Sequence, residues 1–405
     1  MSEYASASHT VRKKDGMVRV LQFFRGFNAL LKSHSGGLED ITTNTDKMGK
    51  ATCLTGLDLA SCFLQLQIRK EDRHLTAFRD AEGKLWQYVR CGFGLKTLPV
   101  AFASYVGGQL MEVKSKGVRK WLGDIVILTE TVEGQFRLLH QTFDCLRKGH
   151  LSINLPKSEF CKSVVEWLGM VIDRSGVRPA SSKTEDISQL SQPTTVEDVR
   201  VLLGMGGSLR LFIPSFSTVV VPISDLLREK RFHGKRARRS KVTWGMAERE
   251  ATRKLIDFLT NPRILALPDW DKPFRLHTDA SEIGAGAGLT QFSGTVEKVI
   301  TYASHRCTIN DKNRALEFFD LDLVSSREKS PIVINVRNVF MLTTNCAALT
   351  WLSKRQSLSA KYHRWALRPM EFDMALELGA GTRHQLADAL SRASCQEPRK
   401  VTIDD

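Results

Sequence analysis

The chain has 405 residues, of which 42% are hydrophobic and 25% are charged. This length allows two to four domains, and the composition excludes wholesale disorder, collagen and the small disulfide scaffolds. Lys and Arg outnumber Asp and Glu by 59 to 44, and the resulting net charge of +15 favours a polyanionic partner.

Targeting and cysteine patterns are uninformative by comparison. No run approaches the length of about 18 apolar residues that a membrane span needs, and the N-terminus lacks a signal-peptide pattern. The eight cysteines form no CxxC pair, so neither a zinc module nor a disulfide framework is predicted. We expect no membrane partner and an intracellular location, cytoplasmic or nuclear.

The first 180 residues or so mix short apolar runs with helical patches. Alternating or apolar runs predict strands, and apolar residues recurring at every third and fourth position predict helices. The predicted strands are residues 54–59, 63–68, 86–89, 125–129 and 164–172, and the predicted helices are residues 99–111 and 132–148. This order predicts an α+β domain and not a βαβ repeat.

A second, helical region opens at residue 194. Thr194 and Glu197 have the spacing of a capping box ahead of an amphipathic stretch at residues 196–211. The strongly basic stretch at residues 228–241 follows, and it is either a solvated linker or a nucleic-acid contact. Strands are predicted again at residues 274–279 and 285–291, which begin a third domain near residue 273.

Two aspartates stand beside predicted strands. Asp58 closes the apolar run at residues 54–59, and Asp124 precedes the run at residues 125–129. Carboxylates from neighbouring strands can hold two divalent cations about 3.5–4 Å apart for in-line phosphoryl displacement. Either aspartate alone would be interpreted as a turn or cap residue, because Asp is common in turns.

Motifs in order along the chain decide the context of these aspartates. The first set reads VRKKDG at 11–16, RGFN at 25–28, LDLASCFLQ at 57–65, TAFR at 76–79, CGFGLKTLPVAF at 91–102, WLGDI at 121–125, NLPKSEF at 154–160 and WLG at 167–169. The second set reads LLGMGGSLRLFIPSFS at 202–217, WGMAERE at 244–250, LALPDWDKPFRLHTDAS at 265–281, YASHR at 302–306, ALTWL at 348–352, RWALRPMEFD at 364–373 and ADALSR at 387–392. Together they resemble the reverse transcriptase and ribonuclease H region of gypsy-type LTR retrotransposon Pol polyproteins.

The resemblance implies a right-hand polymerase with fingers, palm and thumb, followed by a ribonuclease H-like α/β domain. The expected divisions are fingers and palm at 1–178, a thumb-like helical subdomain at 179–227, a basic tether at 228–272, the ribonuclease H-like domain at 273–394 and a tail at 395–405. Motifs of a protease, a nucleic-acid knuckle or an integrase are not found, so a truncated reading frame and a processed polyprotein product both stay open.

For the polymerase, the resemblance implies that Asp58 and Asp124 are metal-binding catalytic residues. Phe63 would exclude a 2′-hydroxyl on the incoming nucleotide, and Lys157 would donate a proton to the leaving pyrophosphate. Taken singly, Phe63 would be interpreted as a packed strand aromatic, and Lys157 is equally well an ordinary exposed lysine. The residues that match nucleotide- and template-binding blocks are Lys13, Lys14, Arg25, Phe93, Gly94 and Lys96, and those that match the primer grip are Trp167, Leu168 and Gly169.

For the C-terminal domain, the resemblance implies four metal-binding carboxylates that act on the RNA strand of a hybrid. Asp279 matches the first of them and Asp388 the last. Counting back without gaps from residues 348–352 places Asp320 where the family has Glu, and Asn345 where the family has Asp.

The chain departs from the family at two metal positions. The polymerase signature of the family is an aromatic residue, any residue and two aspartates, but Gly123 replaces the first of these aspartates. Glycine supplies no oxygen ligand, and the neutral Asn345 loses the charge that favours a hard cation. We therefore expect both sites to bind metal weakly, unless Asp124 or Glu130 substitutes for the missing ligand.

Two functions follow from these observations. The first is an RNA-directed DNA polymerase with a fused ribonuclease H, impaired at Gly123 and Asn345, that needs Mg²⁺ or Mn²⁺, deoxynucleoside triphosphates and an RNA or DNA primer–template. The second is a catalytically silent nucleic-acid-binding remnant. The fold supports both, because function resides in the site and not in the scaffold. The oligomeric state is left open.

Overall fold

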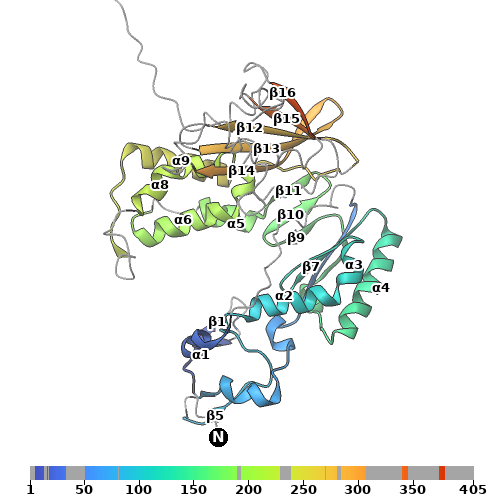
Figure 1. Cartoon of the computed structure of the whole chain (residues 1–405), viewed down its shortest axis with the longest axis vertical. Coiled ribbons are helices and arrows are strands. Elements are labelled where there is room, and N and C mark those ends of the chain that lie inside the picture. The colour runs from blue at the N-terminus through green and yellow to red at the C-terminus, as the bar shows by residue number, and fades with distance from the viewer. Residues whose placement is uncertain are drawn as a thin grey trace, which may run out of the picture. The chain divides into compact units, whose positions relative to one another are not determined.

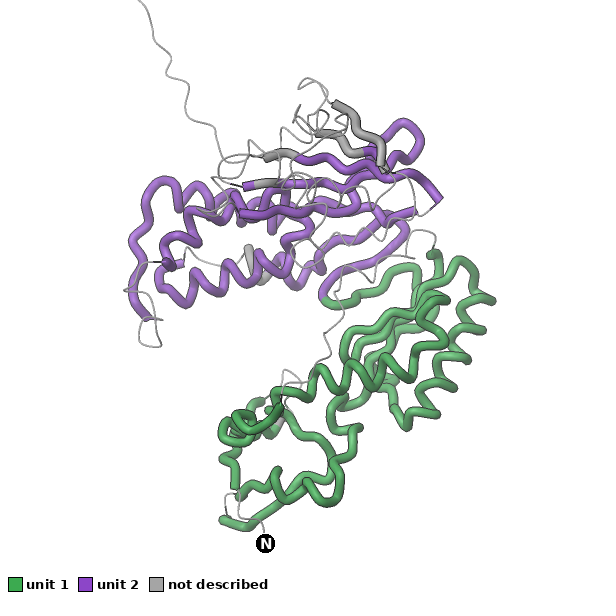
Figure 2. Tube along the Cα trace, viewed as in Figure 1, with its two compact units in different colours: residues 1–44, 50–168 green, residues 45–49, 169–405 purple. Residues whose placement is uncertain are grey.

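The computed structural model describes residues 5–12, 16, 18–32, 51–80, 82–188, 193–228, 239–269, 271–280, 284–306, 340–344 and 374–378. These residues form two compact units, one ending at Leu168 and the other starting at Gly169 (Figure 2). Figure 1 shows the helices and strands of both units. Within the described part of the chain, no helix is long and apolar enough to cross a membrane.

The first unit is built on a four-stranded sheet in the order β6-β7-β3-β8, in which all neighbours are antiparallel. Its strands are β3 (Cys53–Asp58), β6 (Val118–Trp121), β7 (Asp124–Thr129) and β8 (Glu159–Lys162). Helices α2 (Leu98–Gln109), α3 (Met111–Lys114) and α4 (Val132–Lys148) bury their apolar sides against it.

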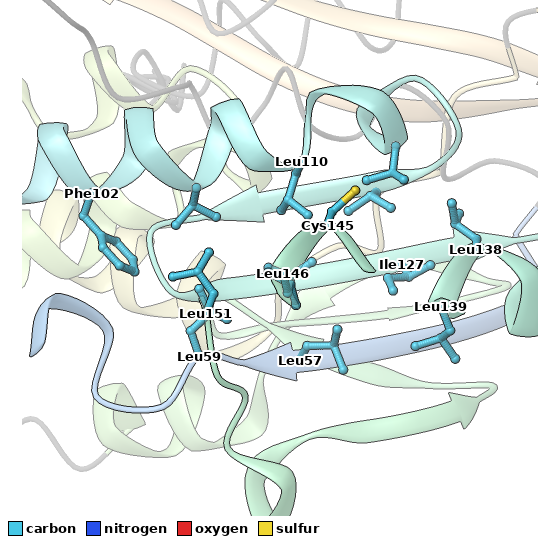
Figure 3. Close-up of a cluster of buried hydrophobic side chains, with 14 residues drawn as sticks. Leu57, Leu59, Phe102, Leu110, Ile127, Leu138, Leu139, Cys145, Leu146 and Leu151 are labelled. Carbon is cyan, nitrogen blue, oxygen red and sulfur yellow. The ribbon is translucent and has the colours of Figure 1, made fainter. Parts of the chain in front are cut away.

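The hydrophobic core of this unit lies between the sheet and these helices. Figure 3 shows Leu57 and Ile127 of the sheet facing Phe102 of α2 and Leu146 of α4. Ile127 and Phe102 are fully buried. Because side chains alternate between the faces of a strand, the apolar positions of β3 and β7 that enter this core also fix the direction of their neighbours.

The remaining elements of the first unit are short. They are β1 (Ser8–Arg12), β2 (Val18–Gln22), α1 (Arg25–Leu30), η2 (Cys62–Gln65), η3 (Lys70–Thr76), β4 (Phe78–Arg79), β5 (Leu85–Trp86), η4 (Leu155–Lys157) and β9 (Val165–Trp167). Strand β1 pairs with β2, and β4 pairs with β5, both antiparallel.

The second unit contains a five-stranded sheet in the order β14-β13-β12-β15-β16. Strand β12 is antiparallel to β13 and parallel to β15, and β15 is parallel to β16. Its strands are β12 (Phe274–Ala280), β13 (Gly284–Ser293), β14 (Val296–Arg306), β15 (Phe340–Thr344) and β16 (Met374–Leu378).

A hairpin and a group of helices precede this sheet in the second unit. They are β10 (Met170–Asp173), β11 (Gly176–Pro179), α5 (Ser181–Ser188), α6 (Val196–Ser208), η5 (Arg210–Phe212), α7 (Phe216–Val219), α8 (Val221–Leu226) and α9 (Met246–Thr260). The Ser217 amide donates to the Ser304 hydroxyl at 2.9 Å, and Arg306 forms an ion pair with Asp225 at 2.9 Å. These bonds attach α7 and α8 to β14.

Several local predictions differ from the structure. The single strand predicted at residues 164–172 is divided into β9 (Val165–Trp167) and β10 (Met170–Asp173) by the turn at Leu168 and Gly169, whose φ angles are positive. Of the strand predicted at residues 86–89, only Trp86 is in a strand, at the end of β5 (Leu85–Trp86).

Residues 63–68 were predicted to form a strand, but the chain leaves the sheet after Asp58 and turns at Ser61, whose φ is 50°, into the 3₁₀ helix η2. The apolar side chains of this segment meet the core from a turn, which the alternating pattern does not distinguish from a strand. The capping box is formed by Thr195 and Asp198, one residue later than predicted.

Candidate functional site

Strand pairing brings Asp58 and Asp124 together at one edge of the four-stranded sheet. Asp58 ends β3, Asp124 begins β7, and the two residues are register partners in an antiparallel pair. Directly opposed residues on antiparallel strands point to the same face, with Cβ atoms about 4.5–5.5 Å apart. Beyond this pair, the amide of Leu59 donates to the carbonyl of Gly123 at 2.8 Å. The sheet therefore presents two carboxylates side by side.

The charge state of Asp124 reflects this arrangement. Burial, followed by the neighbouring Asp58 carboxylate, raises the pKa of Asp124 above its ordinary value, and the Lys157 ammonium opposes the rise. Both carboxylates are half-buried. Two like charges held together in a partly desolvated place are typical of a functional site, because a stable scaffold gains nothing from them.

Lys157 is placed beside these carboxylates by backbone hydrogen bonds. The Asn154 amide donates to the Asp58 carbonyl at 2.6 Å, and the Asp58 amide donates to the Ser158 hydroxyl at 3.2 Å. The Ser158 hydroxyl in turn donates to the Asn154 carbonyl at 2.9 Å. The segment that carries Lys157 is thus bound to the end of β3, and its ammonium lies within electrostatic reach of Asp124.

Gly123 lies in the tight turn between β6 and β7. Leu122 before it adopts a left-handed backbone with a φ of 50°, and Gly123 itself is buried. A Cβ atom at residue 123 would overlap the Sγ atom of Cys62. Cys62 was not predicted as a site residue, and the sequence offers no signal for it, because the contact joins two segments that are distant along the chain.

The described side chains do not fit a two-metal site. A pair of divalent cations held about 3.5–4 Å apart would need oxygen ligands from several side chains. Asp58 and Asp124 supply two carboxylates, and Gly123 supplies none. In the ranges that the structure describes, no group of three or more His, Cys, Asp or Glu side chains could hold a metal ion. The donor set at this edge is incomplete for Mg²⁺ or Mn²⁺ pairs.

Phe63 lies close to this edge, in η2. Its ring packs edge-on against Phe93 and Phe102, with both pairs of ring centroids 5.5 Å apart. Edge-to-face pairs of this kind add stability beyond the area they bury. Phe63 is therefore held in place on two sides, and Phe102 connects it to the hydrophobic core.

The loop that carries Gly94 and Lys96 is held by α1. The Asn28 side-chain amide donates to the Gly94 carbonyl at 2.8 Å, and its oxygen accepts from the Lys96 amide at 2.9 Å. Gly94 has a φ of 115°, and a Cβ there would collide with the Gln22 carbonyl, so only glycine fits. Arg25 is exposed at the start of the same helix. Asn28 was missed as a site residue, although the RGFN motif contains it.

The predicted primer-grip residues form a turn. Trp167 ends β9 and is buried, Leu168 has a φ of 56° and Gly169 a φ of 71°. Asp279 lies on β12, but its side chain is outside the described part of the structure. Lys13, Lys14, Asp320, Asn345 and Asp388 also lie outside the described residues.

Known families match two parts of the chain. Residues 11–172 match the family described as reverse transcriptase (RNA-dependent DNA polymerase). Residues 244–318 match the RNase H-like domain found in reverse transcriptase. The first match includes the Asp58–Asp124 pair, and the second includes β12, β13 and β14.

Relatives of the whole chain are retrotransposon polyproteins. The Pol polyprotein from transposon opus of Drosophila melanogaster is 29% identical over 399 residues, which are 96% of this chain and 40% of the relative. The Drosophila transposon 297 Pol polyprotein is 28% identical, covering 98% and 37%. The Tf2-3 polyprotein of Schizosaccharomyces pombe is 27% identical, covering 94% and 28%. The chain therefore spans two fifths or less of the length of these relatives.

Solved structures share the fold. A foamy viral protease-reverse transcriptase in complex with double-stranded DNA superposes with a TM-score of 0.76 at 21% identity, covering 94% of this chain and 66% of that chain. The same kind of protein in complex with RNA/DNA hybrid gives 0.75 at 20% identity, covering 100% and 53%. The predicted fold, a right-hand polymerase followed by a ribonuclease H-like domain, is confirmed.

Proposed function

Since the chain is the reverse transcriptase and ribonuclease H-like region of a gypsy-type retrotransposon Pol polyprotein, we propose that it is an RNA-directed DNA polymerase with a fused ribonuclease H whose polymerase site is impaired. The observation that carries the proposal is Gly123, which stands at the turn beside the Asp58–Asp124 pair and brings no carboxylate. In this proposal the chain keeps the polymerase fold but lacks one metal-binding carboxylate, at residue 123.

The missing oxygen limits catalysis through metal affinity. In two-metal phosphoryl transfer, the carboxylates of the site would hold two ions, which would supply stabilisation of the attacking and leaving oxygens. Loss of an outer-shell partner already costs roughly 10–100-fold in affinity or activity, and loss of a direct ligand costs more.

Nucleic-acid binding depends on different groups and is proposed to persist. The net charge of +15, the exposed Arg25 and the Lys157 ammonium supply the electrostatic attraction on which phosphate contacts depend. The proposed partners are primer–template, RNA–DNA hybrid and deoxynucleoside triphosphates. The ribonuclease H activity is proposed to be impaired as well, on the resemblance that places Asn345 at a metal-binding aspartate.

Primer–template binding and primer extension test the proposal together. We expect a dissociation constant in the nanomolar to micromolar range, with an affinity that falls linearly on a log–log plot against salt. Binding that is absent, or independent of salt, would refute the nucleic-acid function.

In the extension assay with Mg²⁺ or Mn²⁺, Asp58→Ala is the matched control. Extension by the parent that is slow, but faster than that of Asp58→Ala, supports an impaired polymerase. Extension equal to that of Asp58→Ala supports the alternative, a silent nucleic-acid-binding remnant. Efficient extension by the parent with Mg²⁺ contradicts both.

A further inference from the structure

We propose that Cys62 is a positioning residue of the polymerase site, whose thiol fills the space that a side chain at residue 123 requires. It follows that the lost carboxylate can return only when Cys62 is replaced at the same time. The inference rests on the proposed function for its catalytic meaning, but the packing claim can be tested without any catalysis.

The space around Gly123 is closed by one atom. A Cβ atom built there would come closer to Cys62 Sγ than real Cβ contacts do. The next nearest atoms are the Cβ of Cys62 at 3.5 Å and the Cβ of Leu59 at 3.9 Å, which are ordinary van der Waals distances. Among these neighbours, only the thiol of Cys62 obstructs a Cβ atom at residue 123.

The backbone at Gly123 does not itself demand glycine. In this turn the left-handed conformation is adopted by Leu122, at a φ of 50°, and Gly123 is not among the glycines with positive φ. Gly94 differs, because its φ of 115° and the Gln22 carbonyl exclude any other residue. The backbone conformation at position 123 therefore permits an L-residue, and it is the Cys62 thiol that obstructs its side chain.

The position of Cys62 is determined by the turn that carries it. The thiol lies 3.5 Å from the Leu59 carbonyl as a donor. The Gln65 side chain, at the other end of η2, donates to the Ser152 carbonyl at 3.0 Å and accepts from the Ser152 amide at 2.6 Å. Phe63 is packed between two rings. A larger residue at 123 must therefore displace the thiol, because Phe63 and Gln65 hold η2 directly after Cys62.

This packing changes the expected outcome of the obvious reversion. From the sequence alone, Gly123→Asp is expected to raise primer extension well above the parent. In the structure, the new side chain must first displace the half-buried thiol of Cys62 beside the two carboxylates. The packing therefore predicts that Gly123→Asp alone gains little, and that C62A/G123D gains more.

A double-mutant cycle on thermal unfolding tests the packing. We expect Gly123→Ala to lower Tm by an amount on the order of 5 °C, as overpacking does. In the Cys62→Ala background the same substitution is expected to cost almost nothing. Gly108→Ala is the control, because a Cβ there meets nothing within 4 Å. An equal fall in Tm in both backgrounds, or none in either, would overturn the proposal.

Metal binding and primer extension test the positioning role. We expect C62A/G123D to bind Mn²⁺ and to extend a primer at least roughly tenfold better than both Gly123→Asp alone and C62A/G123N, which brings a side chain of the same size without the charge. Equal Mn²⁺ affinity in Gly123→Asp and the double variant would overturn the role of Cys62. If the unfolding cycle succeeds but the double variant gains no extension, the packing claim stands and the proposed cause of impairment fails.

Discussion

The two sheets of the molecule hold acidic side chains in opposite ways. In the four-stranded sheet Asp124 faces Asp58, and burial followed by that like charge raises the pKa of Asp124. In the five-stranded sheet burial also raises the pKa of Glu297, but a hydrogen bond from Thr290 and the contact with His277 outweigh it and hold the pKa below its ordinary value. Glu297 lies 2.6 Å from both partners.

The difference separates a carboxylate that stabilises the fold from one that lowers the stability of the fold. Glu297 is compensated by a donor and a ring nitrogen, so its charge helps to keep β13 and β14 together with β12. The Asp58–Asp124 pair is compensated only partly, by Lys157, and makes the fold less stable when no cation is bound. A carboxyl group whose neighbours raise its pKa is therefore the better candidate for a site.

The largest expected effect concerns the core beneath the carboxylate pair. Ile127 on β7 is fully buried, so Ile127→Ala should lower the free energy of unfolding by about 2–5 kcal/mol, through lost burial and the cavity that remains. Urea denaturation provides the measurement. The exposed Val132 provides the control as Val132→Ala, for which a change within about 0.5 kcal/mol is expected. Equal effects would show that β7 is not the packed base of the pair.

The compensated acid should give the next largest effect. Glu297→Ala removes the acceptor of the buried Thr290 hydroxyl and the partner of the buried His277 ring. We expect a loss of about 1–3 kcal/mol in the free energy of unfolding, because a buried polar group is left unsatisfied. Lys298→Ala on the same strand, at an exposed position, should be nearly neutral. If Glu297→Ala left the free energy of unfolding unchanged, the claim that Glu297 stabilises the fold would be wrong.

The like-charged pair should give a smaller effect of the opposite sign. Asp124→Asn removes the repulsion with Asp58, so we expect the free energy of unfolding at pH 7 to rise by roughly 0.2–1 kcal/mol in metal-free buffer. Asp144→Asn is the control, because Asp144 pairs with Arg147 at 2.8 Å and its loss should not stabilise. Destabilisation by Asp124→Asn would mean that the pair is compensated after all.

The smallest expected effect is the response of these differences to pH. The lowered pKa of Glu297 gives stability that is present above its ordinary value of 4.5 and is lost as the pH falls through the folded-state pKa. The raised pKa of Asp124 gives stability that is present below 3.8 and is lost as the pH rises through the folded-state pKa. Acidification should therefore reduce the loss in free energy of unfolding caused by Glu297→Ala. It should also reduce the gain in free energy of unfolding caused by Asp124→Asn. Urea titrations between pH 3 and pH 7 measure both differences.

Local patterns predicted the elements that have strong periodicity. The helix predicted at residues 132–148 is α4, Val132–Lys148, where the Thr131 hydroxyl caps the first turn. The strands predicted at 54–59 and 125–129 are β3 and β7 within one residue. The strand predicted at 63–68 was wrong, because Phe63 is held by rings from distant segments and not by a strand partner.

The candidate site was predictable only where a motif marked it. Asp58 and Asp124 were predicted from the ordered motifs that contain them, and the structure brings them together. The hold of Asn28 on Gly94 and the packing of Cys62 against Gly123 could not be predicted. Both depend on contacts between segments more than 60 residues apart, which leave no local periodicity.

Manganese occupancy beside Asp58 tests the central claim most directly. Crystals of the parent protein with primer–template, soaked in Mn²⁺ and measured at the manganese absorption edge, report how many ions the pair holds. Because Gly123 offers no carboxylate, the proposed impairment predicts at most one weakly occupied ion next to Asp58 and Asp124. Two fully occupied ions at bridging distance would contradict it.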